Sequence, residues 1–141
     1  MSNKIKLTFS AISEKESFAR SVIACFALKL NPSIAEISDI KTAVSEAVTN
    51  SIVHGYPDGK GEITLVAEIE DKTLHIKILD DGVGIENVEE ALEPFYTTKP
   101  EDERSGMGFT IMQSFMDFVS VKSEKGKGTQ IYMSKTLKTG A

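Results

Sequence analysis

The sequence contains no tryptophan, four prolines and a single cysteine among its 141 residues. One cysteine can form neither an internal disulfide nor a thiolate zinc site, which favours a reducing compartment. Because Cys25 lies within the apolar run 22–26, we expect it to fill the core. No stretch reaches the ~18 apolar residues of a spanning helix, and residues 1–10 lack the apolar segment of a signal peptide. These absences argue against a membrane protein and favour the cytoplasm.

Basic residues are also scarce relative to acidic ones. Lysine and arginine total 16 against 21 aspartates and glutamates, which gives a net charge of −5. Nucleic acids favour basic surfaces, so this balance argues against a nucleic acid partner. The length and the 40% hydrophobic content fit one globular domain over residues 1–141, with a core large enough to need no disulfide or metal.

The pattern of apolar residues predicts an α+β protein. Apolar and polar residues alternate in half-buried strands, whereas apolar residues spaced by three or four are typical of helices. The expected elements are a strand at 5–9, helices at 13–30 and from 33 or 38 to 54, a strand hairpin at 63–78, a short helix at 88–92, a helix at 108–117 and a closing hairpin at 119–134.

Capping signals and element order refine this prediction. Ser13 and Glu16 have capping-box spacing at the start of the first helix, and Ser33 or Ser38 can begin the second. The order β-α-α-β-β-α-β-β predicts a two-layer α/β sandwich, with a mixed, mostly antiparallel sheet on one face and helices on the other. A Rossmann fold would need regular alternation of strands and helices, so it is disfavoured.

Glu46 and Asn50 are four residues apart, so they share one face of the second predicted helix, beside its apolar stripe. An asparagine oxygen suits Mg²⁺, which usually takes few protein ligands together with phosphate oxygens. The carboxylate of Glu46 could accept a proton from a hydroxyl group. Alone, however, this pair is equally typical of a solvated helix edge.

Asp80, Gly82 and Gly84 leave the second strand of the first hairpin. Glycines allow the backbone to approach a flat ligand closely. A carboxylate at Asp80 would accept hydrogen bonds from an exocyclic amine and repel a carbonyl oxygen, which selects adenine over guanine. Alone, the stretch is typical of an ordinary glycine turn.

The stretch Gly106-Met107-Gly108 opens the next predicted helix. Free N–H groups and the positive end of the helix dipole make a helix start a site for anions. Arg104 and Lys99 precede it and could reach a terminal phosphate. A lone glycine pair of this kind occurs in many loops.

Two further residues have weaker signals. Thr129 begins the last strand and could hydrogen-bond to Asp80 or to a water beneath the adenine, although threonine is common in strands. Arg20 interrupts the apolar stretch of the first helix and is a candidate for binding a partner, although charged residues in such places usually extend to solvent.

Three of these stretches together resemble the N, G1 and G2 boxes of the GHKL ATPase superfamily, which includes gyrase and the histidine kinases. They are residues 46–50, 80–84 and 106–108. Residues 45–56 resemble the anti-sigma-factor serine kinases, and residues 93–115 are very similar to the anti-sigma F factors of sporulation. The likeness covers nearly the whole chain and implies the Bergerat fold of that superfamily.

The resemblance also implies a role for each motif residue. Proteins of this kind carry a lid over the ATP phosphates, which would span about residues 95–106 here. The implied roles are Mg²⁺ coordination by Asn50, general base catalysis by Glu46, adenine recognition by Asp80, shaping of the pocket by Gly82, Gly84, Gly106, Met107 and Gly108, and phosphate contacts from the lid by Lys99 and Arg104.

By the same resemblance, the cofactors are ATP and Mg²⁺. The activity is phosphorylation of a serine in an anti-anti-sigma factor, together with binding of a sigma F-like sigma factor by a homodimer. The alternatives are a general stress-response kinase, an ATP-dependent sigma-binding switch without kinase activity, and the catalytic half of a split histidine kinase. The last would use a phosphoacceptor histidine, and His54 and His75 fit structural or surface roles instead.

Overall fold

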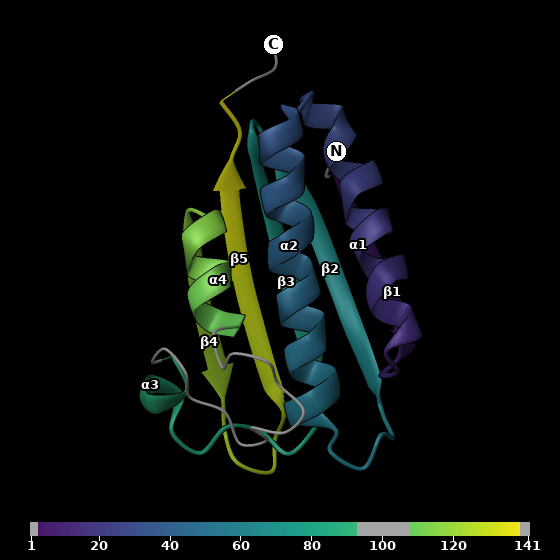
Figure 1. The fold of residues 1–141 in the computed structure, drawn as a ribbon, viewed down its shortest axis with the longest axis vertical. Coiled ribbons are helices and arrows are strands. Elements are labelled where there is room, and N and C mark those ends of the chain that lie inside the picture. The colour runs from purple at the N-terminus through teal and green to yellow at the C-terminus, as the bar shows by residue number, and fades with distance from the viewer. Residues whose placement is uncertain (1–2, 93–107, 139–141) are drawn as a thin grey trace.

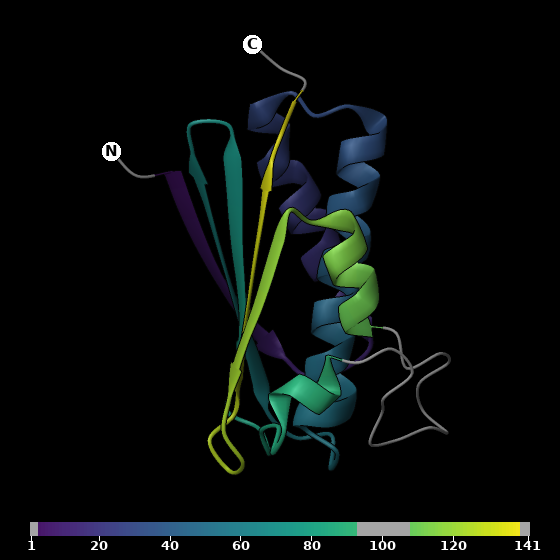
Figure 2. The ribbon, with the colours of Figure 1, turned by 90° about the vertical axis from the view of Figure 1, so that its left-hand side faces the viewer.

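The computed structural model describes residues 3–92 and 108–138, which form a five-stranded sheet with a layer of helices on one face (Figures 1 and 2). The helices are α1 (Glu14–Ala27), α2 (Ile34–Asn50), a short α3 (Val88–Ala91) and α4 (Gly108–Phe115). The strands are β1 (Asn3–Ser10), β2 (Glu62–Glu70), β3 (Thr73–Asp80), β4 (Phe118–Ser123) and β5 (Thr129–Thr136). The predicted two-layer α+β sandwich is confirmed.

The sheet has the strand order β1-β2-β3-β5-β4, and all four neighbouring pairs are antiparallel. The predicted mixed sheet is therefore wrong for the described strands. Because α1 and α2 run in opposite directions, they return the chain to the end of the sheet where β1 stopped, and β2 pairs antiparallel with β1 (Figure 1). Strands β3 and β4 run in the same direction, since each pairs antiparallel with β5, which lies between them.

The core lies between the sheet and the helices. Buried Ile63 and Leu65 of β2 and Ile76 and Ile78 of β3 alternate with more exposed neighbours, as the sequence pattern predicted. The buried residues of α2 are Ile40, Ala43, Val44, Ala47 and Val48. Burial of one branched aliphatic side chain contributes about 1.5–3 kcal/mol, so this contact fixes α2 firmly on the sheet.

The capping box lies on the second helix. Ser13 has helical backbone angles and makes no side-chain cap, so the predicted pairing of Ser13 with Glu16 is wrong. At the start of α2, the Ser33 hydroxyl accepts from the Glu36 amide at 3.0 Å, and the Glu36 carboxylate accepts from the Ser33 amide at 2.9 Å. Glu36 also accepts a hydrogen bond from the main-chain amide of Lys138 at 2.8 Å.

The structure also corrects the prediction for Cys25, which is exposed. The buried face of α1 is formed by Ala19, Ile23, Phe26 and Ala27. At about 100° per residue, Cys25 lies roughly 200° from Ile23 and so points away from the sheet. The apolar run suggested burial because it is longer than the face that one helix can bury.

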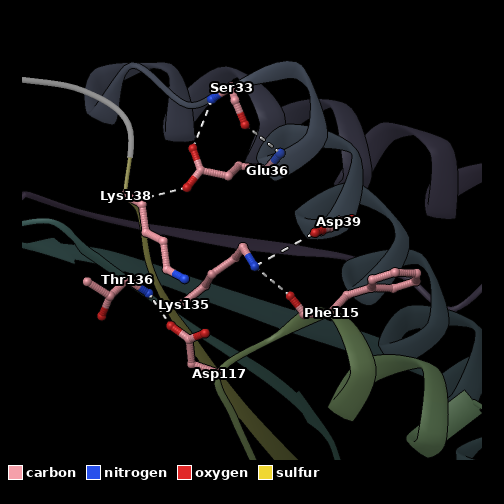
Figure 3. Close-up of polar contacts among 8 residues, drawn as sticks. All are labelled: Ser33, Glu36, Asp39, Phe115, Asp117, Lys135, Thr136 and Lys138. Atoms are coloured by element: carbon pink, nitrogen blue, oxygen red, sulfur yellow. Dashed lines mark hydrogen bonds and ion pairs between the residues drawn. The ribbon is translucent and has the colours of Figure 1, made fainter.

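A lysine ties α2, α4 and β5 together at one end of the sandwich (Figure 3). The Lys135 ammonium donates to the carbonyl oxygen of Phe115, the last residue of α4, at 2.8 Å, and lies 3.8 Å from the Asp39 carboxylate of α2. The Asp117 carboxylate accepts from the Thr136 amide at 2.7 Å and anchors the turn after α4 to β5. A cation at a helix C-terminus also interacts favourably with the helix dipole.

Within residues 3–92 and 108–138, no helix combines the length and the apolar character needed to cross a membrane.

Candidate functional site

The candidate site lies at one end of the sandwich, where β3 and α2 end and α4 begins (Figures 1 and 2). Of the predicted site residues, the structure places Arg20, Glu46, Asn50, Asp80, Gly82, Gly84, Gly108 and Thr129. Four others, Lys99, Arg104, Gly106 and Met107, lie outside the described residues, as does the predicted lid at 95–106.

Asp80 is the last residue of β3 and only 7% exposed. Its Oδ2 accepts a hydrogen bond from the Ser51 hydroxyl at 2.8 Å, and its Oδ1 accepts one from the Gly82 amide at 2.9 Å. Burial raises the pKa of this carboxyl, while the donors of Gly82 and Ser51 and the Thr129 amide oppose that rise. The carboxyl is thus a buried acceptor with three protein donors, from Ser51, Gly82 and Thr129.

The glycines around Asp80 are required by contacts within the protein. A Cβ on Gly82 would lie 2.0 Å from the Gly55 carbonyl oxygen, and one on Gly84, with φ +76°, 2.1 Å from that of Glu124. A Cβ on Gly128, with φ +86°, would lie 2.1 Å from the Asp80 carbonyl oxygen. These glycines bring three loops together around the end of β3, whereas the sequence prediction attributed Gly82 and Gly84 to close approach of a ligand.

Sequence reasoning missed the residues that support Asp80 from behind. Ser51 and Gly55 begin and end a π-helical turn that follows α2 directly, in place of the predicted continuation to residue 54. The Tyr56 hydroxyl then accepts from the Asp81 amide and donates to the Glu62 carbonyl, both at 2.7 Å. π-helical turns are frequent at functional sites, but no local sequence pattern predicted this one.

Glu46 and Asn50 lie one turn apart near the end of α2, and both are half-buried. Asn50 is the last residue of α2 and directly precedes Ser51, which hydrogen-bonds to the Asp80 carboxylate. The end of α2 therefore brings Asn50 into the neighbourhood of Asp80. Thr129 is paired with Asp80 across β3 and β5, but its hydroxyl bonds to that of Ser123 at 2.8 Å. The Thr129 side chain therefore holds the β4–β5 hairpin together, while its main-chain amide donates to the Asp80 carboxyl.

Gly108 is buried and is the first residue of α4, which packs against α2. The start of α4 is directed toward the end of the molecule where α2 and β3 end (Figure 2). The first amides of α4 and the positive end of its dipole therefore face this end of the molecule, which suits a phosphate-bearing ligand. The helix ends at Phe115, two residues before the predicted end.

Arg20 lies on the wall of a groove between α1 and α2, about 460 Å³ in volume. Its guanidinium is 3.5 Å from the Glu16 carboxylate and 3.4 Å from the Ser45 hydroxyl, and its side chain is 37% exposed. The groove residues are Arg20, Ile34, Ile37, Ser38, Lys41, Thr42, Ser45 and Glu46. Glu46 therefore borders both the end of α2 and an open groove with a basic residue on either helix.

Comparison with known proteins agrees with this geometry. Residues 9–135 match the histidine kinase-like ATPase domain family. The chain is 58% identical over 135 residues to the anti-sigma F factor of Clostridium acetobutylicum, covering 96% of this chain and 94% of that protein. It is 55% identical over 138 residues to the anti-sigma F factor of Geobacillus sp. strain WCH70, covering 97% and 94%.

Solved structures share the fold at low sequence identity. The RsbU and RsbW domains of Rv1364c from Mycobacterium tuberculosis align with a TM-score of 0.67 at 18% identity, over 95% of this chain and 32% of that one. The catalytic domain of histidine kinase ThkA aligns with a TM-score of 0.60 at 16% identity, over 94% and 96%. ATP binding follows from the family match. The chain belongs to the histidine kinase-like ATPase domains of the GHKL superfamily and, within them, groups with the anti-sigma F factors.

Proposed function

We propose that this protein is an anti-sigma factor and a protein-serine kinase. It binds and inhibits a sigma F-like sigma factor, and it uses Mg·ATP to phosphorylate a serine of an anti-anti-sigma factor. It acts as a single-domain homodimer in the cytoplasm during sporulation. The observation that carries the proposal is the arrangement of Asp80, Asn50 and Glu46 at one end of the sandwich, in a chain 58% identical to an anti-sigma F factor.

The residues around Asp80 fit an adenine base. A carboxylate offers about four acceptor positions, and the donors from Ser51, Gly82 and Thr129 leave room for one more. The small exposed part of Asp80 allows an exocyclic amine to reach it. A guanine would instead present a carbonyl oxygen, which a carboxylate repels.

The end of α2 fits a magnesium-bound triphosphate. No group of three or more metal-binding His, Cys, Asp or Glu side chains exists in the part of the chain that the structure describes. Mg²⁺ in nucleotide sites usually needs only one or two protein oxygens besides phosphate and water, and Asn50 supplies one. When bound, the metal would neutralise charge on the phosphates, and the amides at the start of α4 would donate to the same phosphates.

Glu46 would orient the incoming serine hydroxyl and accept its proton. Phosphoryl transfer depends mainly on positioning and on stabilising charge, and a carboxylate near the nucleophile fulfils the first need. The groove between α1 and α2 leads to Glu46 and offers the cations Arg20 and Lys41, so it suits a partner with acidic residues near its acceptor serine. Lys99 and Arg104, in the proposed lid, would contact the terminal phosphate.

The deciding experiment is incubation of the purified protein with Mg²⁺, γ-labelled ATP and an anti-anti-sigma partner. We expect label on a serine, with transfer falling about 10²- to 10⁴-fold in Glu46→Gln while ATP affinity is kept. Glu89→Gln, an exposed carboxylate on α3, is the matched control and should keep full activity. Binding without transfer would indicate a nucleotide-dependent switch, and acid-labile phosphohistidine on the partner would indicate a histidine kinase.

Sigma-factor binding is tested separately by co-purification in the presence of Mg·ADP or Mg·ATP. Arg20→Ala should weaken retention of the sigma factor, whereas Lys29→Ala, on the 3₁₀ turn after α1 and outside the groove, should not. A protein that retains no sigma factor with either nucleotide would contradict the anti-sigma part of the proposal.

A further inference from the structure

Ser51 is fully buried and lies directly after Asn50, at the start of the π-turn that ends α2. Its hydroxyl donates to Oδ2 of Asp80 at 2.8 Å, across 29 residues of sequence. A buried hydroxyl needs a partner, and a π-turn instead of a regular α-helical turn is the local departure that accompanies this placement.

Besides the Thr129 amide, three groups of the protein hold the Asp80 carboxylate. Ser51 bonds to Oδ2 and the Gly82 amide bonds to Oδ1, so the two oxygens are fixed from different segments of the chain. Gly55 closes the third side, because a Cβ there would lie 3.0 Å from Oδ2. Of these groups, only Ser51 contributes a side-chain donor, so it can be changed without altering the backbone.

We propose that Ser51 is a specificity-determining residue that positions the Asp80 carboxylate for adenine. This inference rests on the proposed function in that Asp80 reads the base. The Ser51 hydroxyl occupies the inner side of Oδ2 and prevents rotation of the carboxylate, so that its remaining lone pairs face the exocyclic amine of adenine. A hydrogen bond to a charged acceptor is stronger than a neutral one and suits this orienting role.

Loss of the hydroxyl has a selective consequence. Without Ser51, the carboxylate can turn about its Cβ–Cγ bond and its acceptor positions no longer coincide with the amine. ATP then loses its main base-specific hydrogen bond, whereas GTP, which is repelled in either orientation, loses little. Removing binding that is equal in ground state and transition state raises KM and leaves kcat unchanged.

The experiment compares Ser51→Ala and Ser51→Cys with the unchanged protein by calorimetry and competition, using Mg·ATP and Mg·GTP. In Ser51→Ala we expect ATP affinity to fall about tenfold, with GTP affinity nearly unchanged, so that the ATP preference falls by about the same factor. The kcat for transfer should stay constant while KM for ATP rises. Ser51→Cys, nearly the same size but a weak donor, should fall between the other two.

The control is Ser134→Ala, which makes the same chemical change on β5 in register with His75 and away from the site. It should bind both nucleotides as the unchanged protein does. An unchanged ATP preference in Ser51→Ala overturns the inference, as does an equal loss for ATP and GTP, which would mean a merely structural role. If Ser51→Ala does not fold, the ATP preference of Ser51→Cys decides. Absence of ATP binding by the unchanged protein would instead contradict the proposed function.

Discussion

The α-carbon of Gly82 lies directly against the carbonyl oxygen of Gly55, so a Cβ on Gly82 would come within 2.0 Å of that oxygen. The same carbonyl accepts the Val83 amide at 2.9 Å, which locks the loop after β3 onto the turn after α2. Gly82 also donates its amide to Asp80. The close approach of two backbones thus holds the Asp80 carboxylate in place.

We therefore expect Gly82→Ala to lower the free energy of unfolding by about 3 kcal/mol, at the upper end for overpacking because the opposing atom is backbone. Gly59→Ala is the control, since Gly59 has φ +75° but open space around it, and should cost only about 1 kcal/mol of backbone strain. Urea unfolding measures both. Equal destabilisation of the two variants would show that the loop can move away from Gly55.

The contacts of the Lys135 ammonium with Phe115 and Asp39, here called the Lys135 clamp, give a second prediction (Figure 3). Lys135→Met keeps the apolar stem of a side chain that is 14% exposed but removes its bonds to Phe115 and Asp39. We expect a loss of about 1–2 kcal/mol, because a charge-assisted hydrogen bond disappears while Asp39 and the helix end can still be hydrated. Denaturant midpoints at neutral pH measure it.

Lys138→Met is the matched control for this clamp. Its main-chain amide binds Glu36, and that bond survives a change of side chain. The variant should stay within about 0.5 kcal/mol of the unchanged protein. A Lys135→Met protein as stable as Lys138→Met would mean that the clamp contributes nothing.

Cys25 provides a prediction about the outer face of α1. Because the thiol is exposed, a thiol reagent should modify it in the native protein at a rate within a few-fold of that in urea. Cys25→Ser should change stability by less than about 0.5 kcal/mol. Protection of the thiol from the reagent would mean that this face of α1 is covered in solution. Repeating the measurement at low protein concentration distinguishes burial within the protein from self-association.

Local sequence signals were sufficient for most of the elements. Strand alternation on β2 and β3 and the apolar stripe of α2 depend on neighbours within a few residues, and the structure confirms them. The fully antiparallel pairing of the sheet could not be predicted from such local signals. The position of β5 between β3 and β4 depends on contacts between distant segments. The same limitation explains the wrong capping box, because spacing alone does not distinguish Ser13 from Ser33.

In the candidate site, too, some residues could be predicted from local motifs and others could not. Asp80 and Asn50 could be selected from their motifs, and the structure brings the end of β3 to the end of α2. Ser51 and Tyr56 could not be selected, because their structural roles depend on hydrogen-bond partners 29 and 25 residues away. A serine after an asparagine has no local signature of a bond to a distant carboxylate.

Asp80 also predicts how stability depends on pH. Burial, the largest effect, raises its pKa in the folded protein above the unfolded value of about 3.9. Between these two pKa values the folded state holds a proton that the unfolded state has released, so the free energy of unfolding falls as pH rises through that window. Asp80→Asn lacks this dependence. Its stability relative to the unchanged protein should therefore increase as pH rises from about 4 to about 7.5, as measured by urea unfolding across the series without nucleotide. A relative stability that decreases over the same range would mean that the donors from Ser51 and Gly82 outweigh burial, and that the carboxylate is stabilised by the fold.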